Sequence, residues 1–214
     1  MPTQIYRLKD GTRIPGTTTV ISQNLGWNKQ VLMWWANQEG LAGRNHRDTS
    51  QQAADAGTIA HYLIESDIKG IKPDTSKYPK ELIDLAETSY LNFLHWKDSV
   101  KFKLIHSEIS LISETYKYGA TIDCIAEING QLALLDWKTG NGVYEDHKIQ
   151  LAAYKNIWEE IYPDKPLNGG IYCLRIDKET AGWDMKFRQG FPSSFKVFLK
   201  LLEIHQMKKL VEKE

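Results

Sequence analysis

The amino-acid sequence predicts an α/β (α+β) fold in which helices flank a central mixed sheet containing a three-strand antiparallel meander. Apolar residues at helical spacing dominate the first half of the chain. Short β-rich segments broken by turn residues follow, and a helix, two further strands and a closing helix complete the chain. This order of elements is typical of layered folds with helices packed on a sheet. Because no linker or repeat divides residues 1–214, we expect one domain.

The N-terminal half is predicted to be mostly helical. Residues 4–8 and the following Asp10-Gly11 pair have the pattern of a strand and a tight turn, and the β-branched residues 17–21 extend the chain before helical periodicity begins. Helices are expected over residues 28–40, 51–69 and 79–100. The second of these follows good capping residues at 48–50 and ends at Gly70.

The C-terminal half is predicted to supply the sheet. Strand patterns occupy residues 102–113, 120–128, 132–138, 170–176 and 183–188. Helical patterns return over residues 146–161 and 193–213. Short turns separate the first three strands, so these should pair antiparallel as a meander.

Composition excludes several classes of protein. The 27 Lys and Arg residues balance 27 Asp and Glu residues, so any attraction for phosphate must come from a local patch or a bound cation. Cys124 and Cys173 are too few for a structural zinc site or an iron–sulfur cluster. Buried free thiols suit a reducing compartment, and a disulfide is the alternative. With no long apolar run and no signal peptide, we expect a cytoplasmic protein without a membrane partner.

The pair Asn129-Gly130 sets the register of two neighbouring strands. Both residues accept the positive φ of a two-residue type I′ turn. Counting back from such a turn places Asp123 opposite Asp136 and Thr121 opposite Lys138. Because side chains alternate along a strand, Asp123, Asp136 and Lys138 should share one face of the sheet.

Two carboxylates at this register form a candidate metal site. Directly opposed Cβ atoms lie roughly 4.5–5.5 Å apart, and like charges that close need compensation. A divalent cation that prefers carboxylate oxygen would supply it. Lys138 would then orient an attacking water or stabilise negative charge on a phosphate. The alternative for Asp136-Trp137-Lys138 is an ordinary salt bridge at the end of a strand.

Four motifs in order resemble the PD-(D/E)XK nuclease superfamily, and more narrowly its RecB-like branch. They are Gly57-Thr58-Ile59-Ala60-His61, Gly119-Ala120-Thr121-Ile122-Asp123, Asp136-Trp137-Lys138-Thr139 and Gln150-Leu151-Ala152-Ala153-Tyr154. The segment Pro15-Gly16-Thr17-Thr18-Thr19-Val20-Ile21 adds a similarity to mitochondrial genome maintenance exonucleases and phage-type exonucleases. The resemblance implies a restriction-endonuclease-like core and a metal-dependent deoxyribonuclease.

The resemblance also implies a metal site and a catalytic group. Asp123, Asp136 and Lys138 would be the catalytic residues. Mg²⁺ or Mn²⁺, as one or two ions, would be held by His61, Asp123, Asp136 and the backbone carbonyl of Trp137. The lack of further cysteines separates this chain from relatives that carry an iron–sulfur cluster.

Two glutamates are further candidates near the metal. Glu65 stands four residues after His61, so both project from one face of a helix. Glu108 matches a glutamate often present in the RecB-like branch. The alternative for Glu108 is a solvent-facing position on a strand.

Several residues are candidates for DNA contact. Gln150 and Tyr154 lie on one helix face and, by the resemblance, would position DNA near the scissile phosphate. Side chains that flank the motifs are further candidates: Lys117, Tyr118, His147 and Lys148. Residues 1–46, with the adjacent Trp34 and Trp35, form a candidate DNA-contacting extension, for which core packing of the tryptophans is the alternative.

The function expected from these patterns is a DNA exonuclease that acts on single-stranded or frayed ends in replication, recombination or repair. An endonuclease of the same superfamily, cutting restriction sites, junctions or flaps, is one alternative. A catalytically silent DNA-binding module is another. A phage source would suit the compact form, and the protein would then work in the host cytoplasm.

Overall fold

The computed structural model describes residues 4–214, with the side chain of Lys209 excepted, so the first three residues of the predicted extension lie outside it. Within this range the chain forms six helices and seven strands. The helices are α1 (Thr17–Asn24), α2 (Lys29–Leu41), α3 (His46–Ile68), α4 (Lys80–Asp98), α5 (Glu145–Ile161) and α6 (Pro192–Val211). The strands are β1 (Tyr6–Arg7), β2 (Arg13–Ile14), β3 (Phe102–Ser113), β4 (Tyr118–Ile128), β5 (Gln131–Lys138), β6 (Ile171–Ile176) and β7 (Trp183–Arg188).

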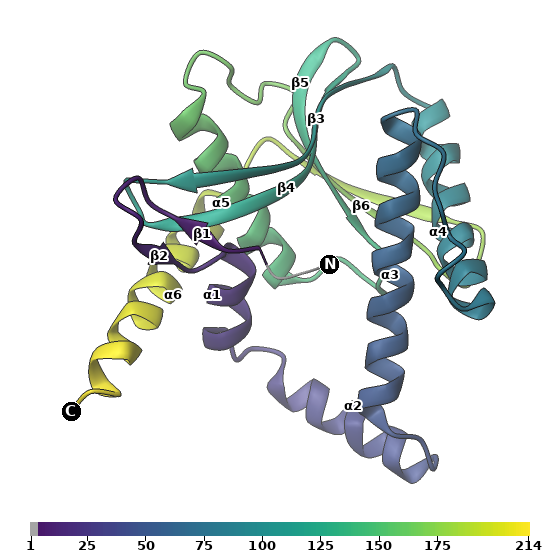
Figure 1. Ribbon diagram of the computed structural model, residues 1–214, viewed down its shortest axis with the longest axis horizontal. Helices are drawn as coiled ribbons and strands as arrows, with labels where there is room; N and C mark the ends of the chain where they lie inside the picture. Colours follow the sequence, from purple (N-terminus) through teal and green to yellow (C-terminus); the bar gives the residue numbers. More distant parts are fainter. Residues whose placement is uncertain (1–3) are drawn as a thin grey trace.

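The five longer strands form one mixed sheet in the order β3-β4-β5-β6-β7. β3, β4 and β5 make the predicted antiparallel meander. β5 and β6 are parallel and are connected through α5, and β7 returns antiparallel to β6. The predicted fold class is therefore confirmed. β1 and β2 form a separate two-stranded sheet that lies beside β4 (Figure 1).

Each face of the large sheet is covered by its own helices (Figure 1). Helices α1, α5 and α6 bury one face, around residues such as Ile122, Leu134 and Phe198. Helices α3 and α4 bury the other, where Trp96 packs against Trp137 of the central strand β5. The central strands are thus enclosed on both sides, and their ends provide a rigid support for a site.

The β4–β5 hairpin has the predicted turn. Both turn residues have positive φ, 52° and 84°, as a type I′ turn requires. The predicted register holds as far as the pair Cys124–Leu135. The described ladder ends there, one step short of Asp123 and Asp136, because β4 and β5 part while β5 continues alongside β6.

The N-terminal segment differs from the prediction. The extended conformation expected for residues 17–21 is wrong, because these residues begin helix α1. Val20 and Ile21 are buried in the core that α5 and α6 also form, and this burial outweighs the β-propensity of the sequence. Helix α3 begins at His46, earlier than expected, because the side chain of Asn45 caps it by accepting the backbone N–H of Arg47.

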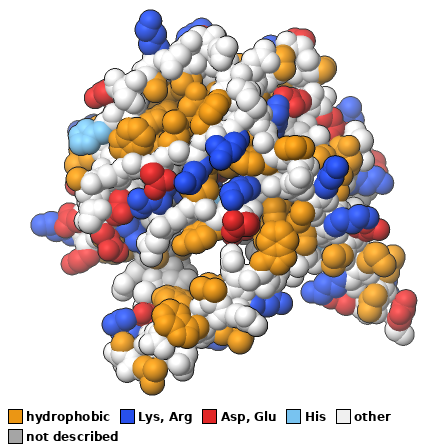
Figure 2. All heavy atoms as spheres, turned by 180° about the vertical axis from the view of Figure 1, so that it is seen from behind, with side chains coloured by type: hydrophobic (Ala, Val, Ile, Leu, Met, Phe, Trp, Pro, Cys, Tyr) orange, Lys and Arg blue, Asp and Glu red, His pale blue; other side chains and the backbone are white. Residues whose placement is uncertain are grey.

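Two helices carry apolar side chains on the surface. Figure 2 shows such side chains over the projecting helix α2 and near the end of α6. The exposed residues are Val31, Leu32, Met33, Trp34 and Leu41 on α2, and Ile204, Met207, Leu210 and Val211 on α6. Of the two candidate DNA-contacting tryptophans, Trp34 is exposed and Trp35 is half-buried beside His46. Across residues 4–214, no helix has both the length and the apolar character needed to cross a membrane.

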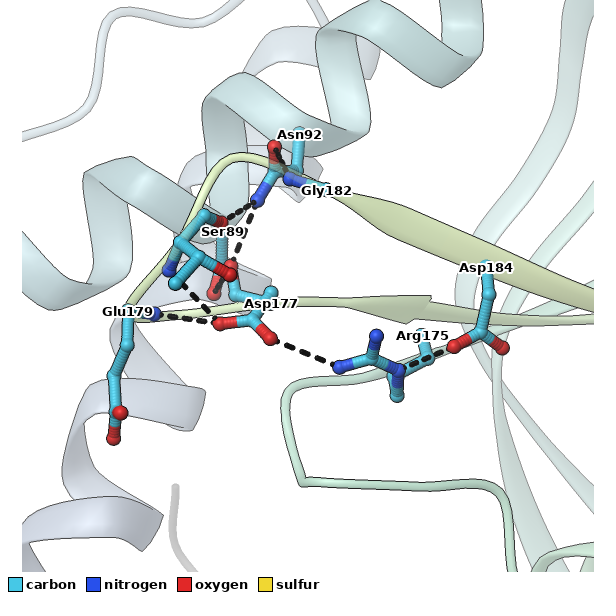
Figure 3. A network of polar contacts seen from close by, with 8 residues as sticks. Ser89, Asn92, Arg175, Asp177, Glu179, Gly182 and Asp184 are labelled. Carbon is cyan, nitrogen blue, oxygen red and sulfur yellow. Dashed lines mark hydrogen bonds and ion pairs between the residues drawn. The ribbon is translucent and has the colours of Figure 1, made fainter.

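A polar network joins α4 to the turn between β6 and β7 (Figure 3). Asn92 Nδ2 donates to the carbonyl oxygens of Asp177 and Thr180, each at 2.9 Å. Its Oδ1 accepts the backbone N–H of Gly182 at 2.8 Å. Arg175 on β6 pairs with Asp177 at 3.0 Å. The buried Asn92 side chain therefore holds this edge of the sheet against α4.

Candidate metal centre

A cleft of about 740 Å³ is lined by residues of α3 and α5 and lies beside the point where β4 and β5 part. Seven of the predicted site residues line it: His61, Glu65, Glu108, Asp123, Lys138, Gln150 and Tyr154. They come from five different elements of the chain, namely α3, β3, β4, β5 and α5. The fold thus gathers in one place the residue types that the sequence analysis singled out.

Three side chains in this cleft have the composition and spacing of a divalent-metal site. Ligand atoms of His61, Glu108 and Asp123 lie within 4.8 Å of one another. His61 Nδ1 is 3.7 Å from Asp123 Oδ2, which is too far for a hydrogen bond but close enough for one cation to contact both. One imidazole nitrogen and two carboxylates suit Mn²⁺ as well as Mg²⁺. This donor set fits the predicted metal.

Glu108 reaches the group through an irregular backbone. Its φ is 52°, in the left-handed region that strains a residue with a side chain. Burial, followed by the charges of Asp123 and Glu65, raises the pKa of Glu108 to about 8. Both features cost folding free energy, and a bound cation would remove the electrostatic part of that cost. The half-buried Glu108 side chain faces the cleft and not bulk solvent.

Asp136 is the most deeply buried carboxylate of the site. Its side chain is 0% exposed, and Lys138 Nζ lies 2.7 Å from its Oδ2. Apart from this ion pair, neither carboxylate oxygen has a hydrogen-bond partner among the described residues. Burial raises the pKa of Asp136, the charge of Lys138 opposes the rise, and the charge of Asp123 adds to it. Lys138 thus balances the charge of Asp136, which lies behind the cleft lining and outside the group formed by His61, Glu108 and Asp123.

Lys138 retains its positive charge at neutral pH. Burial disfavours the ammonium form, but Asp136 and Asp123 outweigh burial and raise the pKa of Lys138. Gln150 Oε1 accepts a hydrogen bond from Lys138 Nζ at 3.2 Å, and Gln150 Nε2 donates to Tyr154 Oη at 2.7 Å. Of the two residues predicted to position DNA, Gln150 therefore contacts the lysine directly, and Tyr154 contacts Gln150.

Two motif glycines allow elements to approach closely around the cleft. A Cβ atom on Gly57 would lie 2.8 Å from Thr139 Oγ1, where α3 crosses the segment after β5. A Cβ atom on Gly119 would lie 2.1 Å from the ring of Tyr6. A larger residue at either position would push α3 or β1 away from the cleft. The glycine requirement of both motifs is therefore steric.

Two further predicted residues lie beside the candidate metal ligands His61, Glu108 and Asp123. The side chain of Trp137 packs in the core, and its backbone N–H donates to Asp123 Oδ2 at 3.1 Å. Glu65 lines the cleft and forms an ion pair with Lys69. That pair leaves Glu65 beside the group formed by His61, Glu108 and Asp123 but outside it.

The four flanking residues predicted to contact DNA do not line the cleft. Lys117 is exposed in the β3–β4 turn. Tyr118 is 0% exposed, and its hydroxyl donates to Ala153 O at 2.8 Å, so its side chain belongs to the core and not to a DNA surface. His147 is half-buried, and burial followed by the charge of Lys138 lowers its pKa. Lys148 pairs within the first turn of α5.

The sequence analysis gave no individual role to three hydroxyl residues of the cleft: Tyr6 of the predicted extension, Ser110, and the motif residue Thr121. Ser110 and Thr121 stand two residues from Glu108 and Asp123 on the same strands, so strand alternation was an available signal. Tyr6 is far away in sequence on β1, and no periodicity or motif connects it to the site.

Known proteins resemble this chain only weakly. Neither a protein-family model nor a curated protein matches the chain. Among solved structures, a protein from Eubacterium rectale provisionally named an exonuclease is 14% identical, with 72% of this chain and 66% of that chain covered and a TM-score of 0.49. A protein designated SSO0001 is 12% identical, with 59% and 57% covered and a TM-score of 0.33. The chain spans less than two thirds of the length of either protein, and likeness at this level says nothing about function.

Proposed function

We propose that the protein is a metal-dependent nuclease that hydrolyses phosphodiester bonds of DNA. The observation that carries this proposal is the convergence of His61, Glu108 and Asp123 within 4.8 Å in a cleft that also contains Lys138. Phosphodiester hydrolysis needs an activated water and stabilisation of negative charge, which a divalent cation and a lysine together supply. The order of the four motifs, similar to that of the PD-(D/E)XK superfamily, gives further support.

The metal would be Mg²⁺ or Mn²⁺, as one or two ions. His61, Glu108 and Asp123 would hold it, and Asp136 and the backbone carbonyl of Trp137 are further ligands that we propose on the motif resemblance. A bound ion lowers the pKa of its water and neutralises phosphate charge. The carboxylates alone would repel a phosphate, so removal of the metal should weaken DNA binding as well as abolish cleavage.

The protein's own groups would place and stabilise the reacting phosphate. Asp136 raises the pKa of Lys138 and so favours its ammonium form, which would stabilise negative charge on phosphate oxygens. The hydrogen bonds from Lys138 to Gln150 and from Gln150 to Tyr154 would keep that charge in place. Helix α5 thus supplies the residues that position Lys138.

The substrate that we propose is a single-stranded or frayed DNA end, which makes the protein an exonuclease of replication, recombination or repair. The similarity to phage-type exonucleases supports this narrower proposal. Residues of the predicted N-terminal extension, Gln4, Thr18 and Thr19, line the cleft and support a DNA-contacting role for that segment. The site of action would be the cytoplasm, or the host cytoplasm for a phage protein.

Cleavage of end-labelled linear and closed circular single-stranded DNA tests the proposal. We expect loss of linear DNA with Mg²⁺ or Mn²⁺, no loss with EDTA, and no cleavage by Lys138→Ala. Lys200→Ala is a matched control, because Lys200 is an exposed lysine of α6 whose ion pair with Glu203 lies outside the cleft.

Each outcome has a distinct meaning. Cleavage of the circle would replace the exonuclease with an endonuclease. DNA binding without cleavage of single strands or of a duplex control would favour a silent binding module. Unchanged cleavage by Lys138→Ala, with Lys200→Ala also unchanged, would refute the assigned site.

A further inference from the structure

A chain of three hydroxyl groups crosses one wall of the cleft. Tyr6 Oη lies 2.8 Å from Thr121 Oγ1, and Ser110 Oγ lies 2.9 Å from the same Thr121 Oγ1. The three residues come from β1, β4 and β3, and all of them line the cleft that holds the metal-binding group. The proposed function described above assigns no task to this chain.

The first hydroxyl of the chain is rigidly placed. The ring of Tyr6 occupies the space that a side chain on Gly119 would need, and it also lies 2.8 Å from where a Cβ on Gly16 would stand. Tyr6 is only 9% exposed, whereas Ser110 at the other end is exposed to the cleft. The hydroxyl chain therefore runs from a buried, fixed end to an open one.

The chain of three hydroxyl groups has one hydrogen more than its internal hydrogen bonds require. Three hydroxyl groups carry three hydrogens, and the two bonds between them use two. The phenol of Tyr6 is the strongest acid of the three, so the preferred order is Tyr6 donating to Thr121 and Thr121 donating to Ser110. The hydrogen of Ser110 is then left for a ligand, and donation along the chain strengthens it as a donor.

We infer that Ser110 donates this hydrogen bond to a non-bridging phosphate oxygen of the DNA strand, and that Tyr6 and Thr121 orient it. This inference rests on the proposed nuclease function and names the part of the substrate that this wall binds. Ser110 stands two residues from Glu108 on β3, and both residues line the cleft. Ser110 would therefore contact a phosphate beside the one that the metal binds.

The charges in the cleft favour a neutral hydrogen-bond donor such as Ser110 over a lysine at this position. A lysine placed there would be captured by a carboxylate, as Lys69 is by Glu65 and Lys138 is by Asp136. A hydroxyl that is already oriented by its neighbours donates to phosphate without forming such a pair. The wall thus recognises the backbone of the strand and not its bases.

Substrates with a single methylphosphonate linkage test the inference, because this linkage is neutral and lacks an anionic oxygen. A set of oligothymidylates, each with the modification at a different linkage, is cleaved in Mn²⁺ by the wild-type protein and by Ser110→Ala. Ser107→Ala is the matched control, because Ser107 lies on the same strand and its buried hydroxyl has no hydrogen-bond partner within the described part of the chain. Calorimetric titration with Mn²⁺ checks that Ser110→Ala keeps the wild-type metal affinity.

We expect Ser110→Ala to lower kcat/KM for the unmodified substrate about tenfold, the usual effect of losing a hydrogen bond to a charged group. One methylphosphonate position should lower the wild-type kcat/KM by a similar factor yet have little further effect on Ser110→Ala. Equal losses for both proteins at every position, or a Ser110→Ala no weaker than Ser107→Ala, would overturn the inference and leave the nuclease intact. A wild-type protein that cleaves no DNA would overturn both.

Discussion

Glu108→Gln is expected to stabilise the metal-free protein at alkaline pH. The pKa of Glu108 in the folded protein is about 8, above its ordinary value of 4.5. Folding therefore favours the protonated carboxyl, and the stability that this form contributes is present below pH 4.5 and lost as the pH rises to about 8. Glutamine has the same shape and no charge to bury, so the variant should not lose stability over that range.

The size of the effect follows from the same two pKa values. A change from 4.5 to about 8 corresponds to at most about 5 kcal/mol by linkage. Glu108 is only half-buried, and solvent screening lowers the expected difference to about 2 kcal/mol. The left-handed backbone of Glu108 is retained in the variant, so its strain cancels in the comparison.

Urea unfolding at pH 5 and pH 9, in EDTA, measures this difference. The two proteins should have similar free energies of unfolding at pH 5, and the variant should be more stable at pH 9. In Mn²⁺ the order should reverse at pH 9, because the wild-type protein gains binding free energy that the variant lacks.

A variant less stable than wild type at pH 9 in EDTA would refute the reasoning, because Glu108 would then be satisfied by the protein alone. Equal stabilisation of both proteins by Mn²⁺ would remove Glu108 from the ligand set. Glu127→Gln, on an exposed ion pair of β4, is the control and should change stability little at either pH.

Three more predictions concern packing and positioning. Gly119→Ala should lower the free energy of unfolding, measured in urea, by about 3 kcal/mol, because its Cβ would stand 2.1 Å from the Tyr6 ring. The control Gly40→Ala, in open space on α2, should raise the free energy of unfolding by about 0.5–1 kcal/mol. Equal effects of the two substitutions would contradict the steric argument. Asn92→Ala should lower the free energy of unfolding by about 2–3 kcal/mol and speed hydrogen exchange in the β6–β7 turn, because three hydrogen bonds of a buried side chain are lost. Unchanged exchange would show that the turn is stable without the Asn92 side chain. Tyr154→Phe should lower kcat about fivefold, equivalent to about 1 kcal/mol, with Mn²⁺ affinity unchanged, and a fall in metal affinity instead would place Tyr154 in the metal site.

Local rules predicted the β4–β5 hairpin well, because its turn depends on two residues only. Asn129 and Gly130 adopt the positive φ that both residue types tolerate, and pairing follows as far as Cys124–Leu135. The parting of the strands beyond that pair is set by β6 and the helices. Counting residues along two strands cannot predict where other elements will separate them.

Residue type and spacing predicted most of the cleft, but not how its members are arranged. The sequence placed Gln150 and Tyr154 on one helix face, but it did not predict that Gln150 accepts a hydrogen bond from Lys138 and donates one to Tyr154. The left-handed backbone of Glu108 could not be predicted, because glutamate has no preference for that conformation. Helix α1 was misread because burial by distant elements decided its conformation.

The hydrogen bond from the Trp137 amide to Asp123 Oδ2 ties the main chain of the central strand to a proposed metal ligand. In a regular antiparallel pair this N–H would meet a backbone carbonyl of the neighbouring strand. Here its acceptor is a carboxylate that we propose as a metal ligand, so a bound cation would draw the carboxylate charge away from this hydrogen bond. The resonance of this one amide should therefore shift with metal titration, although the indole is buried against α4. The chemical shift of the Trp137 amide would therefore report metal binding at the proposed site from within the sheet.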